Sequence, residues 1–424
     1  MAEAHTDSYY AASRNWETSY PPLQENIETD ICICGGGFTG IATALSLAER
    51  GYSVVVLEQH CISWGASGRN GGQIIGGISG TDLMVKRLGN EVADVLWDIG
   101  WRGNDIIRER VEKYGIDCDL KWGYIDVALK QRHMDSFRSF HEELLRHGFG
   151  DDVRMVEQDE IGSVVGSDAY LGGLINNRNG HLHPLNLCIG EARAAENLGV
   201  RIFEGSEVLE LQHGANPIVK TASGKVKANT VVMAGNAYQH LEMKRLGGLV
   251  FPAGSYIIAT EPLTEAEAAE INPLDMAFCD PNNVLDYFRL SADRRLLFGG
   301  RCNYSGRVPA SIKATLEPRM HKIFPQLKGK RIDFEWGGNI AIVVNRVPLI
   351  GRLEHNVYYA IGYSGHGVNV THAVGEIVAD AIAGNREKLE MFERIKHTRI
   401  PFGQMFGSQM VALGMLYFRA LDLF

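Results

Sequence analysis

The chain has 424 residues, of which 45% are apolar and 22% are charged, and its formal net charge is −9. That length exceeds what one compact core usually holds, so about two or three domains are expected, and the acidic balance argues against nucleic acid as a partner, because phosphate binding needs a local basic excess. Residues 1–28 lack the layout of a secretory signal and no run of about 18 uncharged apolar residues occurs, so we expect a cytoplasmic protein without a membrane span.

A strand, a glycine turn and a helix open the folded part of the chain. Thr29–Cys34 is a short β-branched run that ends at glycine, which predicts a buried strand. The pattern Gly-x-Gly-x-x-Gly follows at 35–40, and a run with apolar residues at helical spacing continues to Gly51. A second strand, Ser53–Leu57, ends in Glu58. Together these parts predict the start of a dinucleotide-binding fold.

Each part of this unit has a physical task. Gly35 permits the turn, Gly37 lets the backbone approach a pyrophosphate, and Gly40 lets the helix lie on the strand, with the helix N-terminus facing the phosphates. Glu58 is placed to accept hydrogen bonds from an adenosine ribose. The predicted cofactor contacts of this unit are Gly35, Gly37, Phe38, Thr39, Gly40, Glu58 and Gln59.

Three further segments are rich in small residues. Gly65–Gln73 has the density of small side chains that a planar ring stacked on main chain requires. Val231–Met233 reads as a strand that runs into a small-residue turn, and Val208 lies in a short strand before it. The third segment, 361–369, is a glycine-rich junction before a helix predicted over 371–383, which makes a second helix start suited to negative charge.

These segments resemble the D-amino-acid-oxidase/glycine-oxidase/sarcosine-oxidase superfamily, and Trp336-x-Gly338, Pro348 and Gly351 extend the resemblance over nearly the whole chain. The resemblance implies FAD as cofactor and an enzyme that oxidises a carbon–nitrogen bond. His366 is expected to cap or pack, since the family motif uses glycine backbone. The FAD contacts that the resemblance implies are Ala66, Ser67, Gly68, Arg69, Asn70, Gly71, Gly72, Gln73, Val208, Ala234, Gly235, Asn236, Gly362, Tyr363, Ser364, Gly365, His366, Gly367 and Val368.

The resemblance also implies an α/β fold. A Rossmann-like FAD-binding domain of the glutathione-reductase type would be interleaved with an α+β substrate domain built on an antiparallel sheet. We expect 29–88, 152–246 and 336–388 in the FAD domain, 89–151 and 247–335 in the substrate domain, and 389–424 as a C-terminal helical tail. The apolar stretch Phe402–Phe424 is expected to dock on the body or on another subunit, with peripheral membrane contact as the alternative. The oligomeric state stays open.

Two anchors for a substrate carboxylate are missing. Family members that act on amino acids place an arginine four residues after the tryptophan, where this chain has Ile340, and others have a lysine where this chain has Asn369. A buried carboxylate without a partner costs several kcal/mol, so a small amine without an adjacent carboxylate is the expected substrate. Arg69, Arg289 and Arg346 remain alternative partners for a carboxylate.

Aromatic side chains suit a pocket for an amine, because a ring attracts the cation and packs on its methylene chain. The expected substrate contacts are Tyr363, Trp336, Tyr287 and Asn369, and for each aromatic residue packing in a core is the alternative. No side chain is assigned as a base, since an apolar pocket by itself disfavours the charged amine.

The sequence also bears on flavin attachment, electron acceptor and metals. Family members with covalent flavin use a histidine in the loop that is Trp64–Asn70 here, or a cysteine where this chain has Gly338; His60 and Cys61 are out of register, so we expect non-covalent FAD. Oxygen is the expected electron acceptor. A dehydrogenase that passes electrons to a quinone and a non-catalytic FAD-binding assembly protein are the alternatives. The seven cysteines include no Cys-x-x-Cys pair, so no metal site is expected.

Overall fold

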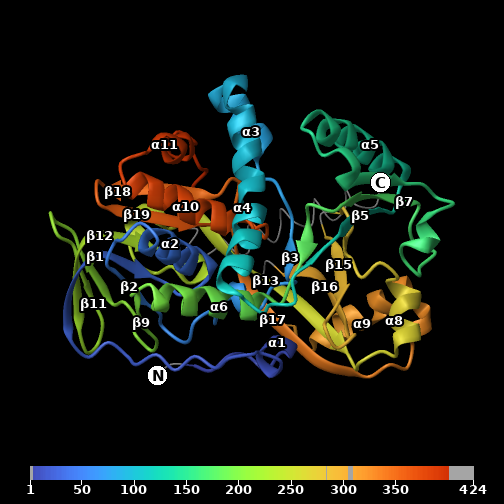
Figure 1. The fold of residues 1–424 in the computed structure, drawn as a ribbon, viewed down its shortest axis with the longest axis horizontal. Helices are drawn as coiled ribbons and strands as arrows, with labels where there is room; N and C mark the ends of the chain where they lie inside the picture. The colour runs from blue at the N-terminus through green and yellow to red at the C-terminus, as the bar shows by residue number, and fades with distance from the viewer. Residues whose placement is uncertain (1–2, 283, 304–308, 401–424) are drawn as a thin grey trace.

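The computed structural model describes residues 3–282, 284–303 and 309–400, and the chain folds around two large sheets (Figure 1). The first sheet and its helices lie on the left in Figure 1 and the second sheet on the right. The long helix α4 (Ala93–Tyr114) stands between them.

The first sheet has a parallel centre in the order β9-β2-β1-β12-β19. Antiparallel strands extend this centre: β11, with β10 next to it, pairs with β12, and β18 pairs with β19. Its central strands are buried on both faces and rich in Val and Ile, as parallel strands covered by other layers are. The strands are β1 (Asn26–Cys34), β2 (Val54–Leu57), β9 (Arg201–Phe203), β10 (Glu210–Gln212), β11 (Ile218–Lys220), β12 (Lys225–Met233), β18 (Leu349–Glu354) and β19 (Val357–Ile361).

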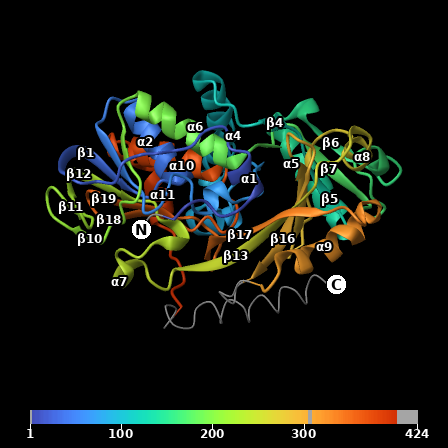
Figure 2. The same ribbon diagram turned by 90° about the horizontal axis from the view of Figure 1, so that it is seen from below.

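Three helices cover one face of this sheet, namely α2 (Phe38–Ala48), α6 (Pro184–Asn197) and α10 (Val370–Ile382). They lie side by side, and α4 packs on α6 and α10 (Figures 1 and 2). Gly375 allows the close approach of α10 to α2, because a Cβ there would lie 2.9 Å from the backbone carbon of Ala42. The predicted strand, helix and strand around 35–40 and the helix after 361–369 are confirmed.

The second sheet runs in the order β17-β13-β16-β15-β14-β5-β7-β6, and its pairs are antiparallel except β14 with β5. The expected α/β fold with a separate antiparallel substrate sheet is therefore confirmed. The strands are β5 (Tyr124–Ala128), β6 (Val153–Val156), β7 (Gly172–Asn176), β13 (Val250–Thr260), β14 (Ala277–Cys279), β15 (Asp286–Leu290), β16 (Leu296–Asn303) and β17 (Ile332–Val343).

One face of the second sheet packs on a hydrophobic core of its own, and the other face points toward the first sheet and its helices. Phe278, Phe288 and Phe298 stack along the outer face, beneath helix α9. A small sheet of β3 (Gln73–Ile74), β8 (Gly180–His181) and β4 (Lys121–Trp122) lies between the layers. The remaining helices are α1 (Tyr9–Ala12), α3 (Thr81–Leu88), α5 (Gln131–Arg146), α7 (Met243–Leu246), α8 (Glu265–Ile271), α9 (Ile312–Ile323) and α11 (Glu387–Glu393).

The strand pairing groups the chain differently from the expected domain bounds at two places. Strands β6 and β7 fall inside the range 152–246, which was assigned to the FAD domain, yet both pair within the second sheet. The strand β17 likewise begins in one expected domain and ends in the other. We propose that the middle segment of the FAD domain begins near Gly180 rather than at 152.

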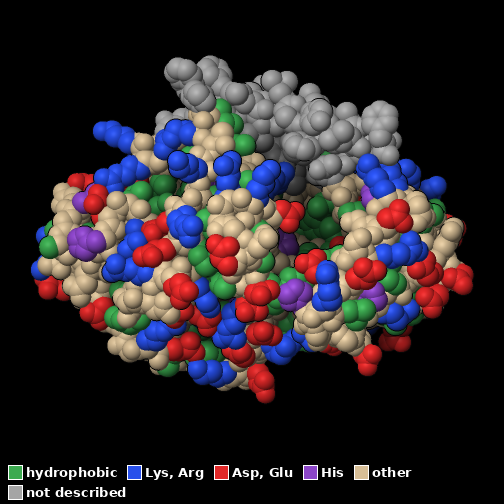
Figure 3. All heavy atoms as spheres, turned by 90° about the horizontal axis from the view of Figure 1, so that it is seen from above, with side chains coloured by type: hydrophobic (Ala, Val, Ile, Leu, Met, Phe, Trp, Pro, Cys, Tyr) green, Lys and Arg blue, Asp and Glu red, His purple; other side chains and the backbone are tan. Residues whose placement is uncertain are grey.

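Among the residues that the structure describes, no helix has the length and apolarity to cross a membrane. Within the same residues, no group of His, Cys, Asp and Glu is arranged to hold a metal ion. Of the expected C-terminal tail, α11 is described, whereas Phe402–Phe424 lies outside the described residues. Acidic and basic side chains are interspersed over the face seen in Figure 3, which is hollowed near its centre.

Candidate active site

A cavity of about 1230 Å³, counting its opening to solvent, lies at the carboxyl ends of the parallel strands. Cys34, Leu57 and Ala234 line it where β1, β2 and β12 end, and ligands of open α/β sheets bind at this edge. The predicted cofactor contacts that line the cavity are Gly35, Gly37, Phe38, Thr39, Glu58, Gln59, Ala66, Ser67, Asn70, Val208, Ala234, Gly235, Asn236, Tyr363, Ser364, Gly365, Gly367 and Val368.

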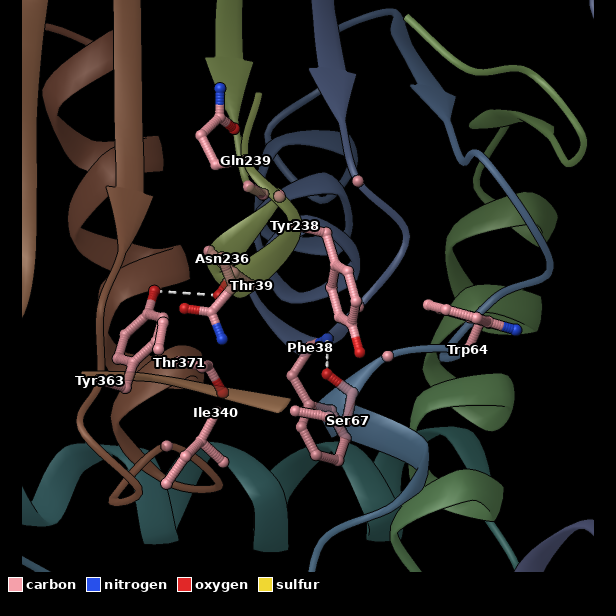
Figure 4. Close-up of a pocket in the computed structure, with 18 of the residues that line it drawn as sticks. Phe38, Thr39, Trp64, Ser67, Asn236, Tyr238, Gln239, Ile340, Tyr363 and Thr371 are labelled. Carbon is pink, nitrogen blue, oxygen red and sulfur yellow. Dashed lines mark hydrogen bonds between the residues drawn. The ribbon is translucent and has the colours of Figure 1, made fainter. Parts of the chain in front are cut away.

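The glycine turn holds the N-terminus of α2 against the cavity. A Cβ at Gly40 would lie 1.9 Å from the carbonyl oxygen of Gly35, so only glycine permits this packing of helix on strand. Gly37 caps α2 without a side-chain hydrogen bond, and the N–H of Phe38 donates to Ser67 Oγ at 2.9 Å (Figure 4). The turn therefore presents backbone and a helix N-terminus to the cavity, as binding of a pyrophosphate requires.

Glu58 lies at the end of β2, where a ribose contact was predicted. Its Oε2 accepts from the N–H of Gly36 at 2.6 Å and its Oε1 from the N–H of His60 at 2.9 Å. Burial raises the pKa of Glu58, and the N–H groups of His60 and Gly36 act in the opposite direction. Glu58 therefore fixes the glycine turn to the end of β2 in addition to lining the cavity.

The cavity wall carries almost no charge. Glu58 is its one acidic residue, and among the lining residues that the structure describes there is neither lysine nor arginine. Negative phosphate groups bound here would therefore be held by backbone N–H groups and by helix N-termini. Neutral, glycine-lined walls and an acid at the ribose position fit the dinucleotide part of FAD.

The glycine-rich segment before α10 closes the cavity on the other side. Thr39 donates from Oγ1 to the hydroxyl oxygen of Tyr363 at 2.9 Å, which joins this segment to α2 (Figure 4). Asn236 accepts from the N–H of Gly362 at 2.9 Å and ties the turn after β12 to the same segment. The buried hydroxyl of Tyr363 has a raised pKa, chiefly because of desolvation, so it stays protonated. Tyr363 is thus part of the cofactor wall.

Eight predicted cofactor contacts do not line the cavity. Several have structural tasks: Gln73 donates from Nε2 to the carbonyl of Phe278 at 2.8 Å, and Gly72 lies against the carbonyl of Leu182. His366 is half-buried, and desolvation lowers its pKa, which fits the expected packing role. The eight are Gly40, Gly68, Arg69, Gly71, Gly72, Gln73, Gly362 and His366.

The inner face of the second sheet forms a wall opposite the small-residue loop 65–73, which we call the flavin loop. Residues paired in register point to the same face of a sheet. One such row crosses the sheet through Trp336, Ile257, Gly299, Tyr287, Cys279 and Asp126.

Tyr287 is the member of this row that reaches the flavin loop. A Cβ at Gly71 would lie 2.6 Å from its ring, and a Cβ at Gly299 would lie 2.2 Å from it, so the ring lies between two glycines. Farther along the row, Tyr124 donates from its hydroxyl to Asp126 Oδ1 at 2.9 Å. The row therefore places an aromatic ring near the loop and a carboxylate two strands away.

The other predicted substrate contacts are engaged elsewhere. Trp336 is 2% exposed and donates from Nε1 to the carbonyl of Arg69 at 3.0 Å. Asn369 is 1% exposed and donates to the carbonyl of Gly100 at 2.9 Å. Neither lines the cavity. Tyr287 does not line the cavity either, but its ring reaches Gly71 in the loop 65–73, so we keep Tyr287 as the proposed substrate contact.

The three arginines considered for a substrate carboxylate donate to the protein itself. Each nitrogen of Arg289 has an acceptor: Nε donates to Gly71, Nη1 to Leu290, and Nη2 to Leu182 and Tyr10, at 2.8 to 3.2 Å. Because these arginines already donate to the protein, they do not replace the carboxylate anchors that the sequence lacks.

The other two arginines make fewer contacts of this kind, each with backbone carbonyls. Arg69 donates from Nε to the carbonyl of Trp64 at 2.7 Å and lies over that ring. Arg346 donates to the carbonyl of Ser364 at 3.5 Å. Ile340, at the position of the family arginine, lines the cavity.

Sequence reasoning missed several lining residues. Tyr238, Gln239 and His240 follow the turn after β12, and His240 Nε2 lies 2.7 Å from the carbonyl oxygen of Val208, a predicted FAD contact. Their signal in the sequence is only their place directly after the small-residue turn. The other missed residues are Cys34, Leu57, His60, Trp64, Gly65, Leu241, Ala341 and Thr371, whereas Ile340 was singled out in the sequence as the position without a carboxylate anchor.

Comparison with known proteins agrees with this geometry. The model of the FAD dependent oxidoreductase family (DAO) matches residues 30–381. Gamma-glutamylputrescine oxidoreductase of Escherichia coli (strain K12) is 40% identical over 420 residues, covering 99% of this chain and 98% of that protein. Probable oxidoreductase OrdL of Haemophilus influenzae is 40% identical over 426 residues, covering 99% of this chain and 98% of that protein.

Solved structures share the fold. Glycine oxidase from Geobacillus kaustophilus superposes with a TM-score of 0.73 at 19% identity, covering 88% of this chain and 100% of that one. L-Amino acid deaminase from Proteus myxofaciens superposes with a TM-score of 0.74 at 19% identity, covering 91% and 97%. The family match extends over most of the residues that build both sheets. The chain belongs to the DAO family of FAD dependent oxidoreductases.

Proposed function

We propose that the chain oxidises the carbon–nitrogen bond of an amine, and that gamma-glutamylputrescine or a related polyamine or monoamine is its substrate. The name of the relative from Escherichia coli, which matches this chain end to end, supports that substrate. FAD held at the glycine-lined cavity would supply the acceptor for a hydride from the carbon that bears the amine. The resulting imine is hydrolysed to an aldehyde and ammonia, and oxygen takes up the two electrons as hydrogen peroxide.

The observation that carries this proposal is the uncharged wall beside the cofactor. Ile340 lines the cavity where a carboxylate anchor would stand, and Arg289 donates all three of its nitrogens to protein acceptors. A carboxylate next to the reacting carbon would have no partner there, at a cost of several kcal/mol. An amine whose acid group is remote or absent avoids that cost.

The same wall assists deprotonation of the substrate. An alkylammonium has a pKa near 10.4, so forming the neutral amine at pH 7 costs about 4 to 5 kcal/mol. Apolar surroundings lower that pKa because they disfavour the charged form. Tyr287 is half-buried beside Gly71 and outside the lining of the cavity, and its ring would first attract the cation and then pack on its carbon chain.

We also propose that FAD is held without a covalent bond. His60 lines the cavity, but its Nδ1 accepts from the N–H of Glu3 at 3.0 Å and its ring stacks on Trp64 at 4.0 Å. Cys61 is an unreactive thiol, because burial raises its pKa to about 12. Acid precipitation should therefore release yellow FAD into the supernatant, and a yellow pellet would contradict this part of the proposal.

The proposal is tested by anaerobic reduction of the purified yellow protein. Gamma-glutamylputrescine, putrescine, butylamine, glycine and sarcosine are mixed with it one at a time, and loss of visible flavin absorbance is recorded. We expect rapid bleaching by the amines, slow or no bleaching by the two amino acids, and hydrogen peroxide once air returns. Bleaching without peroxide would favour a dehydrogenase, and bleaching by the amino acids alone would contradict the proposal.

A further inference from the structure

Three buried charged side chains meet beneath the N-terminus of α10. Arg110 of α4 is 6% exposed, and Glu191 of α6 and His372 of α10 are not exposed at all. None of the three lines the cavity, but Phe38 and Val368, which both contact His372, do. The cluster thus lies one residue behind the cofactor wall.

A continuous set of hydrogen bonds joins the cluster to α2. Arg110 donates from Nη1 to Glu191 Oε1 at 2.9 Å, and from Nη2 to Ser46 Oγ at 2.8 Å and to the carbonyl of Ala42 at 3.1 Å. The other carboxylate oxygen, Glu191 Oε2, lies 3.2 Å from His372 Nε2. The cluster therefore links the two helices whose N-termini face the cavity, together with α4 and α6.

His372 has an acceptor at each ring nitrogen. Its Nδ1 lies 2.6 Å from the carbonyl oxygen of Val368, and its Nε2 lies 3.2 Å from Glu191 Oε2. A neutral imidazole has one N–H, so one of these contacts would then set a nitrogen lone pair against an oxygen lone pair. Both contacts are hydrogen bonds only if both nitrogens carry a proton, which makes the ring an imidazolium.

The remaining groups around the His372 ring are either neutral or favour the imidazolium. Burial raises the pKa of Glu191, and the positive charges of His372 and Arg110 more than offset that effect, so Glu191 is ionised. Thr371 Oγ1 lies 3.4 Å from His372 Nδ1, and Phe38 presents its ring at 5.3 Å. The nearby thiols of Cys118 and Cys188 stay protonated, because burial raises the pKa of each.

Two cations and one anion give the cluster one net positive charge in a place shielded from water. Charge in such surroundings acts over a longer distance than at the surface, because solvent does not screen it. Its sign adds to the positive end of α10, which faces the same cavity. An anion in the cavity is stabilised by both.

We propose that His372 is a positioning residue which, held as an imidazolium between Glu191 and the carbonyl of Val368, keeps a net positive charge behind the FAD wall. The charge favours the reduced, more negative flavin over the oxidised one and so raises the midpoint potential of the bound cofactor. This inference needs only FAD binding and is independent of which amine the enzyme oxidises.

Charge-changing variants test the proposal, because they separate charge from structure. His372→Gln and Arg110→Gln each reduce the net charge of the cluster from plus one to zero. We expect each to weaken binding of reduced relative to oxidised flavin by about 10- to 100-fold, which lowers the two-electron potential by about 30 to 60 mV. Glu191→Gln leaves the charge at plus one or higher and should not lower the potential.

A dye-coupled reductive titration of the holoenzyme measures the three potentials. His213→Gln, at an exposed pair with Glu242, is the matched control and should leave the potential unchanged. If all three cluster variants lower the potential alike, the cluster is merely structural and the proposal is overturned. The same holds if His372→Gln leaves the potential unchanged.

The protonation state has a readout that needs no variant enzyme to be active. Histidine side-chain ¹⁵N spectra of the wild-type holoenzyme should contain one ring with both nitrogens protonated at pH 7.5. That signal should disappear in His372→Gln and persist in Arg110→Gln, where His372 still faces Glu191. A wild-type spectrum in which every buried ring is a neutral tautomer overturns the proposal even if His372→Gln does not fold.

Discussion

Arg289 donates from Nε to the carbonyl oxygen of Gly71 at 2.8 Å, so a cation on the substrate sheet holds the loop that lines the cofactor cavity. The guanidinium is 2% exposed, and Nη2 also donates to the carbonyl of Leu182. Arg289 is one of several side chains that join the two layers, as the Trp336–Arg69 and Gln73–Phe278 hydrogen bonds also do. A residue considered as a substrate anchor is instead an anchor for the flavin loop.

Arg289→Met tests that role. We expect the free energy of unfolding to fall by about 2 to 5 kcal/mol, because the carbonyls of Gly71, Leu182 and Leu290 lose a donor. Urea unfolding of the FAD-loaded protein measures the loss, and FAD should also dissociate more readily. Arg331→Met, at a side chain that is 70% exposed, is the control and should change stability by less than about 0.5 kcal/mol. Equal losses in both variants would argue against the anchoring role.

Gly40→Ala tests the close packing of α2 on β1. Because the added Cβ would lie 1.9 Å from the carbonyl oxygen of Gly35, the helix must shift away from the glycine turn. We expect a loss of about 2 to 3 kcal/mol in stability and of most bound FAD, measured by thermal unfolding and by the ratio of flavin to protein absorbance. Gly162→Ala, where no atom lies within 4 Å of the added carbon, should retain its flavin. Full flavin occupancy in both variants would show that the contact tolerates a methyl group.

The dinucleotide unit was predictable because its signals are local. The strand, the glycine spacing and the helix around Gly40 all follow from neighbouring residues, as does Glu58 at the end of β2. The resemblance then supplied the two later glycine-rich segments. Local chemistry thus determined most of the cofactor wall.

What the sequence did not reveal depends on pairings between distant segments. Asp126 joins the row of Tyr287 only through the parallel pairing of β5 with β14, across about 150 residues of chain. The meeting of Arg110, Glu191 and His372 likewise needs three helices to pack. Asn369 is buried because α4 packs against it, and no local pattern in the sequence predicts that contact.

Ionisation of Asp126 makes the stability of the fold depend on pH, and the direction of that dependence follows from the pKa of its carboxyl. Burial raises the pKa of its carboxyl to about 6, with the Tyr124 hydroxyl acting in the opposite direction. Because the folded value lies above the unfolded value of about 3.9, the stability that this group contributes is fully present below pH ~4 and is lost as the pH rises through about 6. Asp126→Asn removes that loss. The variant should be more stable than the wild type by up to about 3 kcal/mol at pH 7 and equally stable near pH 4.

Thermal unfolding across that pH range measures the difference. Asp135→Asn, on the exposed side of α5 and paired only with Arg138 and Gln131, serves as the control and should follow the wild type at every pH. A stability difference for Asp126→Asn that is the same at pH 4 and pH 7 would mean that ionisation of the carboxyl is not its cause.

Ile340→Arg should convert the site toward carboxylate ligands. The side chain of Ile340 lines the cavity and its Cδ1 lies 3.4 Å from the position of a Cβ on Gly365, beside the proposed flavin segment. A guanidinium there supplies the fork that a carboxylate accepts, at about 1.5 to 3 kcal/mol for a charge-assisted hydrogen bond, or roughly 10- to 100-fold in affinity.

Binding of small carboxylates is followed by the perturbation of the flavin spectrum. We expect acetate and glycine to bind Ile340→Arg at least about tenfold more tightly than the wild type, while kcat/KM for gamma-glutamylputrescine falls, because the new charge repels its ammonium group. Ile340→Met controls for the loss of shape and should bind carboxylates as weakly as the wild type. If Ile340→Arg gains no carboxylate affinity, the uncharged wall at this position does not decide between amines and amino acids, and the substrate must be selected elsewhere in the second sheet.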